Sequence, residues 1–185
     1  TRLNVTVPLY EYTFGGPIMK DHLWFFTAGR LTNQESSRQT FVTNIPYSLT
    51  DQSKRYEGKL TYSVNSNHRF QGAYTKILQD QLNGNQFNVM DLTSLYNASQ
   101  PQDLLALNYN GVLSSTLFVE ARVTNRHLTF HGIGAPTQDV INGTMVRDLI
   151  NGTRYWVSTF CGVCRDEQRD NNDVFVKGNY FLSKK

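Results

Sequence analysis

The sequence predicts an all-β protein, an antiparallel meander of long strands with short turns at one end and long loops at the other. Three observations support this prediction. Apolar and polar residues alternate with a period of two in one segment after another, no segment repeats with the period of a helix, and tight turns alternate with long polar connections.

The first hairpin is expected around the stretch GGPIMKDHLWFF, residues 15–26. The Gly-Gly-Pro triplet is expected to end one strand, the Lys-Asp dipeptide to form the turn, and the run LWFF to begin the next strand. Because Trp24, Phe25 and Phe26 are consecutive, strand alternation places large aromatic rings on both faces of the sheet.

Five further segments alternate as strands do. In RYEGKLTYSV, Tyr56, Leu60 and Tyr62 fall on one face, whereas Glu57 and Lys59 fall on the other. The apolar face of most of these segments also contains glycine. The five expected strands cover residues 55–64, 68–75, 104–113, 116–124 and 173–182.

The connections between these strands are of two kinds. Short turns are expected at residues 19–21, 65–67 and 114–115, and long connections at about 36–54, 81–102 and 131–172. Such long loops are uncommon in compact soluble domains, where the median is about 4–6 residues. Their strict alternation with tight turns is typical of outer-membrane barrels, which have short periplasmic turns and long extracellular loops. The meander is therefore predicted to be part of a transmembrane β-barrel.

A soluble fold remains open at this stage. An apolar and a polar face also describe a soluble sandwich or a lipocalin-like barrel, and the corresponding function is a soluble or surface-displayed β-rich binding module of carbohydrate-binding or adhesin-like type. Full charges on the polar face and aromatic residues near the turns favour the membrane. The two hypotheses differ in whether one set of side chains faces outward or converges on a core: Tyr56, Leu60, Tyr62, Leu107, Tyr109 and Val176.

Composition restricts the function classes further. The 185 residues have a net charge of +3, and their Lys and Arg residues are scattered without forming a patch, so no nucleic-acid partner is expected. No apolar run approaches the ~18 residues of a membrane helix.

Three blocks of the sequence resemble one family. GGPIMKDHLWFFTAGR (residues 15–30) resembles the GGPI-x-KDKLFFF-x-x-YE signature of TonB-dependent outer-membrane receptors of the Oar-like type, and this block is fairly specific. RYEGKLTYSVNSNHRFQGAYT (residues 55–75) resembles the following hairpin of that family, and DNNDVFVKGNYFLS (residues 170–183) resembles a later barrel strand. The last two patterns are common in outer-membrane barrels generally.

This resemblance implies a bacterial outer-membrane protein that imports or binds a large solute at the cell surface. The implied partners are the lipid bilayer, a plug domain and the TonB system of the full-length protein, and an unidentified extracellular ligand. The sequence contains no plug, TonB box or aromatic C-terminal signature strand, so residues 1–185 are expected to form a partial barrel domain of about seven strands. The charged residues expected to face the lumen are Glu57, Lys59, Arg69, Glu120, Arg122 and Lys177.

The sharpest local motif is CGVC, which contains Cys161 and Cys164, the only two cysteines. The simplest interpretation is a disulfide in an extracellular loop. Free thiols and half of a metal site are the alternatives, although neither a second CxxC nor a helical redox context is present. No metal site, cofactor or catalytic residue is predicted, because the sequence has no GxSxG, Walker or HExxH motif and no paired carboxylates. The chain is not expected to be an enzyme.

Overall fold

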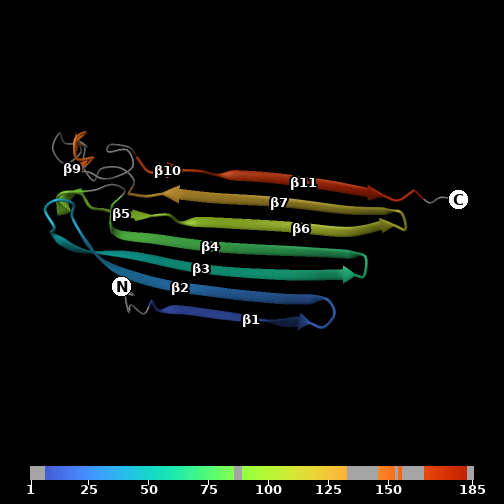
Figure 1. The fold of residues 1–185 in the computed structure, drawn as a ribbon. Coiled ribbons are helices and arrows are strands. Elements are labelled where there is room, and N and C mark those ends of the chain that lie inside the picture. Colours follow the sequence, from blue (N-terminus) through green and yellow to red (C-terminus); the bar gives the residue numbers. More distant parts are fainter. Residues whose placement is uncertain (1–6, 86–88, 133–145, 153, 156–164, 183–185) are drawn as a thin grey trace.

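The computed structural model describes residues 7–85, 89–132, 146–152, 154–155 and 165–182 (Figure 1). This part of the chain forms one antiparallel sheet and a separate two-stranded ladder. Its only helical element is a single 3-10 turn. The predicted all-β meander of long strands is therefore confirmed.

Seven long strands form the body of the sheet: β1 (Leu9–Met19), β2 (Leu23–Gln39), β3 (Pro46–Asn65), β4 (His68–Gly84), β6 (Gln102–Ser114), β7 (Leu117–Phe130) and β11 (Asn171–Tyr180). The shorter elements are η1 (Leu92–Ser94), β5 (Tyr96–Ser99), β8 (Val146–Arg147), β9 (Arg154–Tyr155) and β10 (Glu167–Gln168). Figure 1 shows the long strands side by side, with the tight turns at the right and the short elements at the left.

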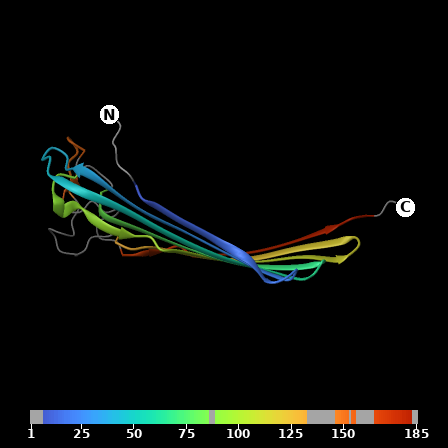
Figure 2. The ribbon, with the colours of Figure 1, turned by 90° about the horizontal axis from the view of Figure 1, so that it is seen from below.

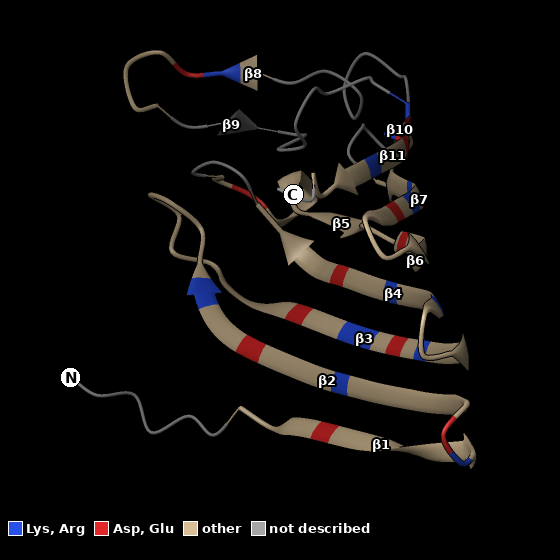
Figure 3. Cartoon of the chain, turned by 90° about the vertical axis from the view of Figure 1, so that its right-hand side faces the viewer, with Lys and Arg blue, Asp and Glu red and all other residues tan. Residues whose placement is uncertain are grey.

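Each long strand pairs with the next along the chain, in the order β1-β2-β3-β4-β6-β7, and β10 and β11 both pair with β7. The small strand β5 adds to β4, and β8 pairs only with β9. Viewed from the turn end, the strands form a twisted open sheet in which β1 and β11 are the outermost long strands (Figure 3).

The three tight turns lie within one or two residues of their expected positions. In the first, Asp21 adopts a left-handed φ of 64°, a conformation that aspartate tolerates, and the His22 N–H donates to the Met19 carbonyl over 3.1 Å. In the second, the Asn65 side chain accepts hydrogen bonds from two following backbone N–H groups. The expected strand end at the Gly-Gly-Pro triplet is wrong, because β1 continues through it to Met19. Pro17 is tolerated there since β1 is paired on one side only among the described strands.

Two long connections are shorter than expected. The strands β2 and β3 extend far into the expected loop at residues 36–54 and leave only residues 40–45 between them. Their ladder runs without a register shift from Leu23 opposite Tyr62 to Gln39 opposite Pro46. Backbone pairing needs no apolar side chains, so the strands continue through polar sequence that was predicted to be loop. The connection after β4 contains η1 and β5, and part of the connection after β7 lies outside the described residues.

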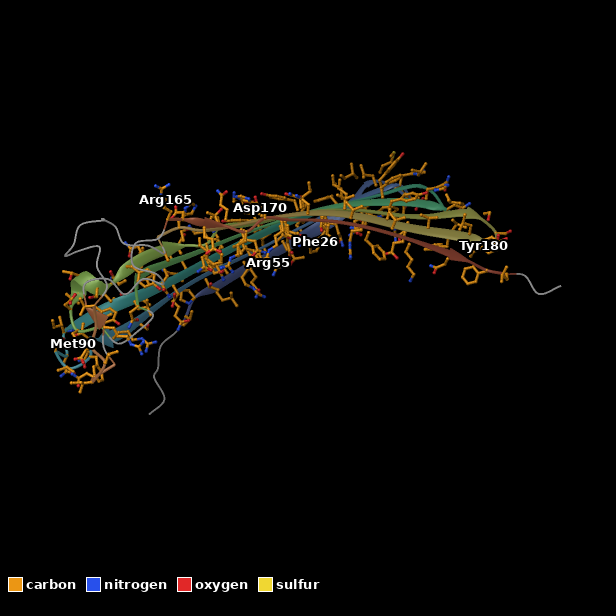
Figure 4. All side chains as sticks on the ribbon, turned by 90° about the horizontal axis from the view of Figure 1, so that it is seen from above. Phe26, Arg55, Met90, Arg165, Asp170 and Tyr180 are labelled. Carbon is orange, nitrogen blue, oxygen red and sulfur yellow. The ribbon has the colours of Figure 1, made fainter. Side chains whose placement is uncertain are left out.

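The sheet is a single layer. Figure 2 shows it nearly edge-on, as a thin band that bends along its length, and in Figure 4 side chains stand out from both surfaces. Among the described apolar residues only Leu49 and Val89 are buried. The described part of the chain therefore contains no core comparable to that of a soluble sandwich.

Candidate functional site

One surface of the sheet, from the turns to the middle of the strands, is built from apolar residues and is called the apolar face. Strand register makes Phe25 of β2 and Leu60 of β3 direct partners. Across β6, β7 and β11, Leu107 lies opposite Val123, which lies opposite Val174. Exposed fractions are high here, with 52% for Leu60 and 71% for Val174. Such a continuous exposed apolar surface marks contact with a membrane or another protein.

The six residues singled out to separate the two hypotheses all lie on the apolar face. Tyr56, Leu60 and Tyr62 are at alternate positions of β3 and therefore lie on one face. Tyr62 belongs to a cross-strand row that passes through Phe70 and Tyr109 and ends at Val176. Within the described residues none of the six is buried. They do not converge on a core.

Aromatic rings form part of this face near the turns. Tyr62, Phe70 and Tyr109 are successive cross-strand neighbours, and the Phe70 and Tyr109 rings lie 4.9 Å apart. The His68 Nδ1 and the Tyr109 hydroxyl are 2.8 Å apart. On the same face, farther from the turns, the Tyr12 ring covers Gly29 so closely that a Cβ added to this glycine would lie 2.2 Å from a ring atom. A glycine beneath an aromatic ring is a known way of stabilising and pinning strand pairs.

Polar groups mark the end of the apolar face toward the loops. Tyr56, Lys76, Asp103 and His127 are successive cross-strand partners and are called the boundary row. The Lys76 ammonium lies 3.8 Å from Asp103, which also accepts a hydrogen bond from the Tyr74 hydroxyl. His127 is paired with Asp170.

The distance from the boundary row to the turns matches a bilayer. On β3 the apolar side of the strand runs from Tyr56 to Val64. This length corresponds to about 27 Å of strand, or about 21 Å of height at a tilt of about 40°. The apolar band of outer-membrane barrels is about 25 Å tall.

The opposite surface, called the charged face, holds all six residues that were expected to face a lumen. Glu57 and Lys59 are two positions apart on β3 and therefore point to the same side of the sheet. Arg69, Glu120 and Lys177 lie in a single cross-strand row on that side, and Arg122 is two residues from Glu120 along β7. The sequence thus predicted their common surface correctly. Whether that surface lines a lumen stays a prediction.

Several charges on this face have partners. Glu11 pairs with Arg30, and the Arg55 guanidinium lies 3.1 Å from Glu57. Lys59 lies over the Phe26 ring at 5.4 Å. Exposed pairs of this kind contribute about 0–1 kcal/mol each, so the charged face is solvated rather than held together by ion pairs. Phe26 and Trp24 lie on it and Phe25 on the apolar face, which confirms the prediction of aromatic rings on both faces of the sheet beside the first turn.

Two histidine–aspartate pairs join β7 to the segment before β11. Besides the pair of His127 with Asp170, the His131 Nδ1 lies 2.6 Å from Asp166, which also accepts the Gly132 N–H at 3.1 Å. The hydrogen bond from His131, supported by the Gly132 N–H, lowers the pKa of Asp166. Cys161 and Cys164, the expected loop disulfide, lie outside the described residues.

A polar groove of about 480 Å³ lies between β2, β3, β4 and β5, on the loop side of the charged face. Register assembles its floor from two neighbouring rows. One row contains Gln34, Asp51 and Gln81, and the other contains Thr32, Ser53 and Gln79, which the backbone of Gln100 joins through a 2.7 Å hydrogen bond. The remaining lining residues are Val7, Gln52, Asp80, Tyr96 and Ala98.

The connections that follow β2 and β4 pack together beyond the groove. Buried Val89 accepts a backbone hydrogen bond from Phe41 at 2.7 Å, and the Thr43 hydroxyl donates to the Met90 carbonyl at 2.6 Å. Asp91 caps η1 by accepting the Ser94 N–H at 2.8 Å. This end of the sheet is therefore built by specific contacts between distant segments.

Comparisons with protein-family models, with curated proteins and with solved structures found no match. In the described part of the chain, no group of three or more His, Cys, Asp or Glu residues is placed to hold a metal ion. No helix among the same residues is long and apolar enough to cross a membrane.

Sequence reasoning missed the groove and the two histidine–aspartate pairs. A signal for the groove was present, because uncharged polar residues or aspartate recur two positions apart at 32 and 34, at 51 and 53, and at 79 and 81. Positions 51, 53 and 81 were assigned to loops, and positions 32, 34 and 79 were assigned to no strand, so their register was not considered. For the histidine–aspartate pairs the sequence offered no signal, since 35 residues separate His131 from Asp166.

Proposed function

We propose that this chain is a wall segment of the β-barrel of a TonB-dependent outer-membrane receptor of the Oar-like type, which imports or binds a large solute at the bacterial cell surface. The observation that carries the proposal is the apolar face. It is uncovered, its height is close to that of the apolar band of outer-membrane barrels, and it lies opposite the charged face. The resemblance of residues 15–30 to the receptor signature supplies the family.

The proposed orientation follows from the asymmetry of the sheet. The tight turns face the periplasm, and the longer connections face outward. The charged face then borders the lumen, where it contacts water and the plug domain of the full-length protein. Ligand captured at the outer end passes the gated plug when the TonB system supplies energy. In this scheme the chain provides wall and binding surface and performs no chemistry.

A soluble binding module would need a second layer over the apolar face. The described residues supply none, and their only buried apolar side chains, Leu49 and Val89, lie toward the loops. No observation on the described residues specifically favours that alternative.

The test uses neighbouring positions on opposite faces of β3. In the full-length protein, with Cys161 and Cys164 changed to serine, Leu60→Cys and Lys59→Cys are produced separately in a Gram-negative host. Leu60→Cys should react with a bilayer-dissolved maleimide and resist a water-soluble one, whereas Lys59→Cys should show the reverse.

Equal labelling of both variants by the water-soluble reagent in isolated outer membranes would contradict the proposal. So would recovery of the protein as a monodisperse monomer that unfolds cooperatively without detergent. Absence of the protein from the outer-membrane fraction would contradict it as well.

A further inference from the structure

The polar groove has a chemistry distinct from that of the rest of the charged face. Four glutamine side chains, two hydroxyl side chains and one carboxylate contribute to its lining: Gln34, Gln79, Gln81 and Gln100, Thr32 and Ser53, and Asp51. Gln52 and Asp80 also border the groove, but strand alternation places their side chains on the opposite face. The described lining contains no lysine or arginine. The nearest cations on the same face are Arg30 and Arg55 on the turn side of the groove, each paired with a carboxylate, and Arg38 lies four residues beyond Gln34 on the loop side.

This composition selects for a class of ligand. An amide offers two donors and one acceptor, and a hydroxyl group offers both functions, so such a surface can bind groups that donate and accept together. Anionic ligands are disfavoured, because Asp51 would repel them and no described cation of the lining compensates. Neutral polyhydroxylated molecules meet both conditions.

Part of the lining is held in place before any ligand arrives. The Gln81 amide donates to Asp51 across the two strands at 2.8 Å. Within the described part of the chain, Gln79 and Gln100 are joined only through their backbones, so their amides are available for a ligand. Fixed neighbours lower the entropy lost on binding.

The dimensions and position agree with a ligand site. Ligand pockets typically measure about 300–1,000 Å³, and the groove measures about 480 Å³. Tyr96 adds an aromatic ring to the lining. The groove lies beyond the boundary row, at the end of the sheet that carries the packed loops.

We infer that the groove binds a neutral oligosaccharide. This inference rests on the proposed function, because it assigns a ligand class to the outward end of the proposed lumen wall.

The test measures binding to the full-length protein in detergent. The probes are hexasaccharides of glucose, mannose, galactose, xylose and N-acetylglucosamine, each with its sulfated counterpart. At least one neutral probe should bind, and its sulfated form should bind at least tenfold more weakly. The double variant Gln79→Leu/Gln100→Leu should weaken the neutral probe at least tenfold, because Leu removes the polar atoms at similar volume.

Gln71→Leu is the matched control. It makes the same change on the same face of β4, about 27 Å along the strand from Gln79, and should leave binding unchanged. The inference is overturned if no neutral probe binds, if a sulfated form binds as tightly, or if Gln71→Leu weakens binding as much as the double variant.

The two proposals fail separately. A protein that remains in the outer membrane with the expected labelling of Leu60→Cys, yet binds no neutral probe, refutes the ligand and leaves the barrel assignment intact. Loss of the membrane location refutes the barrel assignment whatever the probes do.

Discussion

The turn half and the loop half of this sheet use the same backbone pairing for different purposes. In the turn half the faces differ strongly, with exposed Leu60 on one surface and Lys59 on the other. In the loop half both surfaces are mainly polar, as at Asn33 and Gln34 of β2, although single apolar residues such as Leu31 remain. The two halves meet at the boundary row.

The difference shows that pairing and side-chain chemistry are separable. The ladder between β2 and β3 passes through both halves without a register shift. Its hydrogen bonds are made by the backbone, so they hold wherever the strands stay adjacent. Side chains decide what each half contacts: in our proposal, lipid in the turn half and ligand in the loop half.

The largest expected effect comes from placing a charge on the apolar face. Leu60→Arg should lower the free energy of unfolding in lipid vesicles by about 2–4 kcal/mol, because in the proposed barrel an arginine at this position would lie in hydrocarbon near the bilayer midplane. Asn33→Arg, on the same surface in the loop half, should change it by about 0–1 kcal/mol. Urea titrations of the refolded full-length protein measure both values. An equal loss of unfolding free energy in the two variants would contradict the proposed difference between the halves.

A smaller effect distinguishes two glycines within the turn half. Gly29→Ala forces the Tyr12 ring away, because the new Cβ would lie 2.2 Å from a ring atom, and should cost about 1 kcal/mol. An added Cβ at Gly58 meets nothing within 4 Å, so Gly58→Ala should be neutral or stabilise by up to about 0.5 kcal/mol. The same titrations provide the test. A comparable loss for both variants would show that the Tyr12 ring has no special role.

The smallest effect concerns acid in the loop half. Asp166 has a lowered pKa in the folded chain, so its contribution is complete above the unfolded value of about 3.9 and is lost as the pH falls through the lower folded value. Amides of β10 should therefore lose protection from hydrogen exchange below about pH 4, while the β6–β7 ladder keeps its protection. Asp166→Asn should remove this acid dependence. Unchanged β10 protection at low pH would contradict the assigned role of the His131–Asp166 pair.

The sequence predicted the turn half well. Alternation at Tyr56, Leu60 and Tyr62 gave the apolar face, and turn residues such as Asn65 located the hairpins. The sequence predicted the loop half less accurately, because polar segments that form strands there were interpreted as loops. Hydropathy alternation vanishes when both faces meet water, although the backbone ladder continues there.

The sequence by itself determined which side chains share a face within each strand, because that relation depends only on the period of two between neighbouring residues. Tertiary structure decided which rows form across strands. Asp51 meets Gln81, His131 meets Asp166, and the loop after β2 meets Val89 because strand register brings distant segments together. Register depends on the paired backbones of several strands at once, and no local pattern in one segment contains it.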